Sequence, residues 1–177
     1  MATLPTTPTA ATVGSKVLAS NWNSQVQLSE EFFRVNRPIA ALKQTSTQSL
    51  TTATFTGITF DTELLDRDGQ HSTSVNTDRV IIGTTLGWYK VTGTVAFAGN
   101  ATGTRRAAIY LNGAVSNGYA IVTPNATFTS VTVMALVQAT VSTDYVQLMG
   151  WQDSGVALST AASSGFQSYL TVEWIGS

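Results

Sequence analysis

From residue 38 onward, apolar and polar residues alternate along short runs, which is the pattern of half-buried β-strands. In the run GWYKVTGTVAFA, Trp88 and Lys90 fall on one side of a strand and Tyr89 on the other. Gly, Asn, Asp or Pro separates this run from ATFTGITF, DRVII, TRRAAIYLNG, TFTSVTVMALVQA, DYVQLMGWQ and FQSYLTVEWIG. Evenly spaced short strands without intervening helices predict an all-β, antiparallel jelly-roll sandwich over residues 38–177.

The first 37 residues follow a different pattern. Residues 1–14 are rich in Thr, Ala and Pro and lack periodicity, so we expect an extended arm. One short helix should follow, and its bulky apolar residues are Trp22, Val26, Phe32 and Phe33. Such a helix exposes too much apolar surface to stand alone, and it should dock on the domain, on a sister subunit or on a larger assembly. We therefore interpret residues 1–37 as an attachment segment that the jelly roll can fold without.

Two Asn-Gly pairs predict tight turns between strands, because both turn positions require a positive φ. The pairs are Asn112–Gly113 and Asn117–Gly118.

Composition narrows the classes of function. The formal net charge is −1 and charged residues make up 11% of the chain, so a basic face for nucleic acid is not expected. Cysteine is absent, which excludes disulfides, thiol nucleophiles and thiolate metal sites. No secretory signal and no apolar run of about 20 residues is visible, so we expect a soluble protein made in a cytoplasm, without a membrane partner.

Candidate chemistry concentrates in the segment from residue 61 to residue 78. It contains the single histidine, His71, and half of the ten carboxylates: Asp61, Glu63, Asp66, Asp68 and Asp78. No G-x-S-x-G motif supplies a nucleophile for His71, and nothing marks one acid as a general acid. The sequence DRDG is similar to the start of a calcium loop, with Asp66 and Asp68 as ligand candidates, but the terminal Glu is missing. We expect no catalysis, no cofactor and no metal.

Arg105 and Arg106 are adjacent in a strand-like run, so their side chains should point to opposite faces. They cannot form one cationic patch. The arginine on the apolar face needs a neutralising partner, because an unpaired buried charge costs several kcal/mol. We expect that partner in the acidic segment from residue 61 to residue 78, with Asp61, Glu63, Asp66 and Asp68 as the candidates.

Aromatic residues recur on the predicted strands. They are Trp88, Tyr89, Tyr110, Trp151, Tyr169 and Trp174. Tryptophans in loops can stack on sugars, but on the strands of a sandwich they are typical of a core or a subunit interface. We therefore assign these six residues to the core or to an interface between copies of the chain.

The order of motifs over residues 55–176 resembles a domain of actinobacteriophage virion proteins of the minor tail type. It runs from TFDTELLDRDGQHSTSVNTDRVII through GWYKVTGTVAFAGNATGTRRAAIYLNG and ALVQATVSTDYVQLMGWQDSGVALST to SYLTVEWIG. That domain is similar to the globular heads of the tumour-necrosis-factor and complement C1q superfamily. The resemblance implies a ten-stranded jelly roll that forms a homotrimer without catalysis. VGSKVLASNWNSQVQ is similar to segments near the start of many phage tail and fibre proteins.

These observations favour a non-enzymatic structural protein of a phage virion, assembled in the host cytoplasm and attached by its N-terminal segment. Its expected partners are two further copies of itself and other virion proteins. A position at the tail or fibre tip is the leading hypothesis, and capsid decoration is the alternative. A further alternative is an adhesin that binds a host cell-surface glycan.

Overall fold

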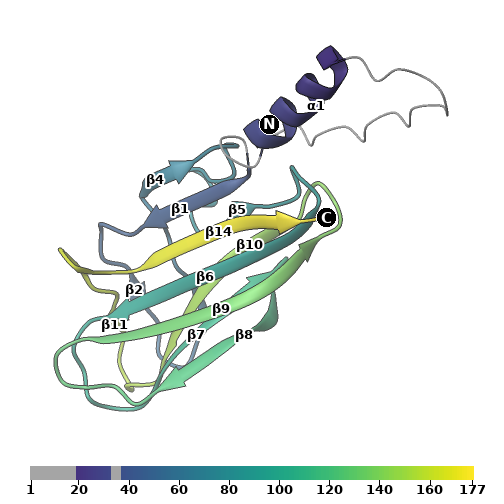
Figure 1. Ribbon diagram of the computed structural model, residues 1–177. Helices are drawn as coiled ribbons and strands as arrows, with labels where there is room; N and C mark the ends of the chain where they lie inside the picture. Colours follow the sequence, from purple (N-terminus) through teal and green to yellow (C-terminus); the bar gives the residue numbers. More distant parts are fainter. Residues whose placement is uncertain (1–18, 33–36) are drawn as a thin grey trace.

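The computed structural model describes residues 19–32 and 37–177, which form one helix followed by a β-sandwich (Figure 1). The helix α1 spans Ala19–Glu31. In spatial order, the first sheet contains β4 (Thr62–Asp66), β1 (Ile39–Lys43), β14 (Tyr169–Gly176), β6 (Gly87–Phe97) and β9 (Thr129–Ala139). The second contains β3 (Thr56–Gly57), β10 (Tyr145–Gln152), β7 (Arg105–Leu111) and β8 (Ala114–Val122), and β5 (Val80–Ile81) also pairs with β10. Two further two-stranded sheets pair β2 (Ser49–Leu50) with β11 (Leu158–Ser159) and β12 (Ala162–Ser163) with β13 (Phe166–Gln167).

The strand pairs formed by the described residues are antiparallel, and the two main sheets contain five strands each. Their inward sides form one apolar core with contributions from both sheets. The predicted antiparallel jelly roll is therefore confirmed.

The long antiparallel pair of β6 and β9 shows how the alternating sequence produces this architecture. The two strands pair without interruption from Gly87↔Ala139 to Phe97↔Thr129. Along β9 every second side chain is buried, from Thr129 to Ala139, and the intervening ones are exposed. Each buried aliphatic side chain contributes about 1.5–3 kcal/mol through the hydrophobic effect, so a shift of one residue in register would lose this contribution along the whole strand.

One of the two predicted Asn-Gly turns is present. Asn112 and Gly113 have φ values of 52° and 79°, and they connect β7 to β8 as expected. The turn predicted at Asn117–Gly118 is wrong, because both residues lie inside β8. A Cβ on Gly118 would lie 3.0 Å from the Cβ of Ala135, so this glycine allows close approach between the sheets instead.

The N-terminal segment is joined to the sandwich at the end of α1. Phe32 is only 2% exposed and meets Trp174 edge to face, with 5.2 Å between the ring centroids. Arg37 then forms an ion pair with Glu173 on the same strand, β14. The attachment role predicted for Phe32 is therefore wrong, because its side chain belongs to the core. The predicted arm, residues 1–14, and Phe33 lie outside the described residues.

Candidate functional site

Asp61 fixes the start of the acidic segment to the turn after β1. Its two carboxylate oxygens accept the backbone N–H groups of Thr45 and Ser46, each at 2.8 Å. Desolvation by itself raises the pKa of Asp61, but these bonds and the hydroxyl groups of Thr45 and Thr62 outweigh it and hold the pKa at about 2. Asp61 is therefore ionised at neutral pH, and its carboxylate has a structural role in holding this turn.

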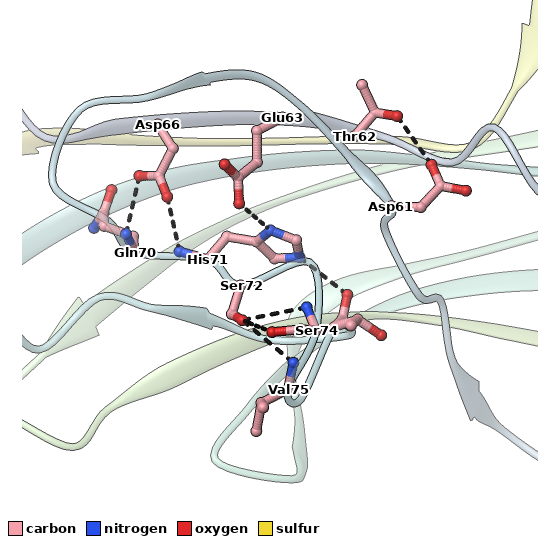
Figure 2. A network of polar contacts seen from close by, with 10 residues as sticks. Asp61, Thr62, Glu63, Asp66, Gln70, His71, Ser72, Ser74 and Val75 are labelled. Atoms are coloured by element: carbon pink, nitrogen blue, oxygen red, sulfur yellow. Dashed lines mark hydrogen bonds and ion pairs between the residues drawn. The ribbon is translucent and has the colours of Figure 1, made fainter.

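His71 is buried between two acceptor oxygens (Figure 2). Its Nδ1 lies 2.9 Å from a carboxylate oxygen of Glu63, and its Nε2 lies 3.1 Å from the backbone oxygen of Thr77. The hydroxyl of Ser72 accepts the backbone N–H groups of Ser74 and Val75 and has no contact with the imidazole. Both ring nitrogens therefore have structural partners, and no Ser–His pair is formed.

Asp66, a cation candidate from the sequence, closes a tight backbone turn. Its Oδ1 accepts the N–H of Gln70 at 2.9 Å, and its Oδ2 accepts the N–H of His71 at 3.0 Å (Figure 2). Asp68 lies close enough to Tyr89 to raise the pKa of the phenol, an effect added to the larger one of burial. Within residues 19–32 and 37–177, no three His, Cys, Asp or Glu side chains gather as metal ligands.

Arg105 forms no ion pair with these acids, so that prediction is wrong. Its side chain is fully buried, and the guanidinium donates to the carbonyl oxygens of Asn100 at 2.7 Å and of Thr102 and Thr104 at 2.9 Å. Desolvation lowers the pKa of Arg105, and the charge of Asp153 opposes this effect. Three carbonyl dipoles, together with the charge of Asp153, stabilise the buried guanidinium, and no carboxylate of the acidic segment takes part.

Distance along β6 explains the failed pairing. Asp68 acts on Tyr89, near the start of β6, whereas Arg105 packs beside Phe97 at its end. At about 3.3 Å per residue, these two positions are about 26 Å apart.

Arg106 points to the opposite side of β7, as the alternation predicts, and it also lacks a partner from the acidic segment. Its guanidinium lies 3.6 Å from the ring centroid of Trp151, on the neighbouring strand, and donates to the hydroxyl of Tyr119 at 3.1 Å. Phe55 packs beside the same cluster, 6.4 Å from Trp151 between ring centroids. We call this outward side of β7 and β10, with Phe55 over it, the covered face.

The outward side of the other sheet differs, and we call the outward residues of β6, β9 and β14 the open face. Its large apolar residues remain exposed: Trp88 (42%), Met134 (59%), Leu136 (51%), Tyr169 (39%) and Ile175 (46%). Its charged residues are Lys90 and Glu173, which are paired in register across β6 and β14. The open face therefore combines five large exposed apolar side chains with uncharged polar ones, and its charges are few.

The six aromatic residues from the sequence analysis divide among three environments. Tyr89 and Trp174 belong to the core, and Trp174 donates its indole N–H to the backbone oxygen of Leu86. Trp151 is 9% exposed on the covered face, where Tyr110 is half-buried 5.7 Å from Phe55 between ring centroids. Trp88 and Tyr169 lie on the open face.

Met134 and Leu136 were missed as candidate interface residues. In TFTSVTVMALVQA, Met134 and Leu136 lie at outward-facing positions of the strand. The other outward-facing positions hold the polar residues Ser130, Thr132 and Gln138. Two large apolar residues in the solvent-facing phase of a strand are the signal that would have identified them.

Neither a family model nor a curated protein matches the chain. Solved structures do match. The globular domain of a zebrafish complement 1qA protein has a TM-score of 0.58 at 10% identity, over 78% of this chain and 98% of that one. Murine APRIL has 0.57 at 14% identity, over 77% and 98%. PRD1 vertex protein P5 has 0.54 at 17% identity, over 79% and 98%.

The chain has the tumour-necrosis-factor-like jelly-roll fold. One of the similar structures is a vertex protein. At identities of 10–17%, these similarities show the fold alone.

Within the described residues, no helix is long and apolar enough to cross a bilayer.

Proposed function

We propose that this chain is a non-enzymatic structural protein of a bacteriophage virion, a homotrimeric jelly roll attached to the particle by its N-terminal segment. The observation that carries the proposal is the open face, where five large apolar side chains remain 39–59% exposed. Several large apolar side chains exposed on one face of a sheet are typical of a protein–protein interface.

A cyclic trimer needs two different surfaces that fit each other, because each copy meets one neighbour on either side. The open face is one of them. The edge formed by β8 and β9 is the other, since both strands are last in their sheets and β8 exposes Val115 and Ile121 beside them. Packing this edge onto a neighbour's open face would cover unpaired strand edges and apolar side chains together.

The acidic segment supports the absence of catalysis. His71, Asp61 and Asp66 are each held by structural partners, and the hydroxyl of Ser72 accepts backbone N–H groups rather than bonding to His71. A nucleophile activated by a base would require a bond between these groups.

The protein has two candidate positions in the virion. The likeness of the N-terminal sequence to the start of tail and fibre proteins favours the tail or fibre tip. The similarity of the fold to a vertex protein favours the capsid as the second candidate. Binding of a host cell-surface glycan stays a prediction.

Imaging of purified particles, with an affinity label on this chain, tests the proposal. Label at the tail tip at low copy number supports the leading position, and regular label at capsid symmetry axes supports the second. Particles that lack the chain altogether would contradict a structural role in the virion.

A further inference from the structure

Helix α1 exposes an apolar strip that nothing in the described chain covers. Trp22 is 65% exposed and Val26 39%, and these two residues lie on one side of the helix. Leu28 is also exposed, but at about 100° per residue it lies on a different side. Only the end of the helix is anchored, through Phe32 against Trp174, and no strand packs along its length in the part of the chain that the structure describes. In Figure 1, α1 projects from the end of the sandwich.

A helix of this length and composition needs packing to be stable. Isolated helices shorter than about 12–15 residues are marginal in water even when rich in alanine. Here α1 has 13 residues, the sequence ASNWNSQVQLSEE, no acid in its first turn and no basic residue in its last. Asn, Ser, Trp and Val are moderate or poor helix formers, so neither intrinsic propensity nor the helix dipole supplies the missing stability.

The spacing on α1 fits packing against other helices. Trp22, Val26 and Ser29 lie at i, i+4 and i+7, which places them along one side. Ser20, Ser24 and Gln27 lie on the opposite side, where the hydroxyl of Ser24 donates to the carbonyl oxygen of Ser20. The helix therefore has one seam with two apolar residues, Trp22 and Val26, and a polar surface opposite it, with Leu28 exposed at the margin of that surface.

A second copy of this chain is the occupant that the charges and the position favour. Within α1 the charged residues are Glu30 and Glu31, at its last two positions, so identical helices can meet without repulsion along residues 19–29. The base of α1 is fixed to β14, whose outward side belongs to the open face. At that end of the open face Leu86, Trp88 and Ile175 are also exposed, so apolar surface continues from the sheet toward the helix.

We propose that α1 packs against the α1 helices of the sister copies and forms a short helical bundle at the base of the jelly-roll trimer. This inference rests on the proposed trimer. Rotation about one axis keeps chain direction, so the helices are parallel and equivalent residues face each other across the axis. The bundle buries Trp22 and Val26 and supplies the packing that a single α1 lacks.

Cysteine cross-linking tests the bundle cleanly, because the chain has no cysteine of its own. Val26→Cys places a thiol in the seam, and Gln27→Cys, the matched control, places one on the polar surface. A disulfide requires Cα atoms within about 7 Å. Mild oxidation of the full-length trimer should link two chains through Val26→Cys, with one thiol left free in each trimer, and should leave Gln27→Cys uncrosslinked.

Light scattering on the same reduced samples separates this inference from the proposed function. A trimer in which neither variant cross-links, or in which both cross-link equally, overturns the bundle and leaves the trimer intact. A monomer overturns the trimer and the bundle with it. The double variant Trp22→Ser/Val26→Ser should remain trimeric and lose the circular-dichroism signal of α1, and an unchanged helical signal would also contradict the bundle.

Discussion

The two sheets differ in how far they expose the outward-facing tryptophan of a central strand. On the covered face Trp151 is 9% exposed, because Arg106 lies over its ring and Phe55 packs beside it. On the open face Trp88 is 42% exposed, although it also stands on a central strand with neighbours on either side. The chain covers the outward side of β7 and β10 itself, although β8 beside them exposes Val115 and Ile121, and it leaves the open face uncovered. This difference points to the open face as the surface used in assembly.

The two faces should therefore respond differently to truncation of a tryptophan. Trp151→Ala should lower the free energy of unfolding by about 4 kcal/mol, because it leaves a cavity under Arg106 and Phe55. Trp88→Ala should lower the stability of an isolated monomer by less than about 1 kcal/mol and should weaken association. Urea unfolding, measured with light scattering on each variant, compares these effects. Equal losses in monomer stability would show that the two faces do not differ in this way.

Arg105, on the inward side of the strand that carries Arg106, offers the next largest effect. Arg105→Ala should lower the free energy of unfolding by about 3 kcal/mol, because the carbonyl oxygens of Asn100, Thr102 and Thr104 lose their donor. Arg105→Lys should recover only part of the loss, because an ammonium group lacks the planar fork that reaches three acceptors. Chemical denaturation measures both variants, and an alanine variant as stable as the parent would refute this role.

Asp61 gives the smallest effect and a pH dependence. Its folded pKa of about 2 lies below the ordinary value of 3.8, so its stabilisation is complete above about pH 4 and is lost as the pH falls toward 2. Because the carboxylate is exposed to solvent, we expect Asp61→Asn to cost only about 1 kcal/mol near pH 7. Unfolding curves of parent and variant should converge near pH 2, and a difference that persists there would exclude the carboxylate as its cause.

The sequence was sufficient for those features of the fold that depend on local periodicity. Period-2 alternation predicted β6, β9 and β14 and the opposite directions of Arg105 and Arg106, because the side a residue faces depends only on its position in a strand.

Long-range partners could not be predicted in the same way. Arg105 donates its hydrogen bonds to backbone carbonyl groups, which every residue possesses and which therefore leave no signal in the sequence. The Asn-Gly pair at Asn117–Gly118 has the composition of a turn, but it continues β8, where a Cβ on Gly118 would lie 3.0 Å from the Cβ of Ala135 on the other sheet. Phe32 resembled the other apolar residues of the helix until its contact with Trp174 distinguished it.

The mass of the full-length protein in solution, parent against Leu136→Asp, tests the central claim most directly. The parent should have three times the 18.7 kDa chain mass, independent of concentration over the accessible range. A carboxylate at Leu136, which is 51% exposed on the open face, should convert it to a folded monomer, because an unpaired charge cannot be buried at an apolar interface. Val156→Asp, at a loop residue that is 58% exposed, is the matched control and should remain trimeric. A parent that is monomeric, or a Leu136→Asp variant that keeps the trimeric mass, would contradict the account of the open face.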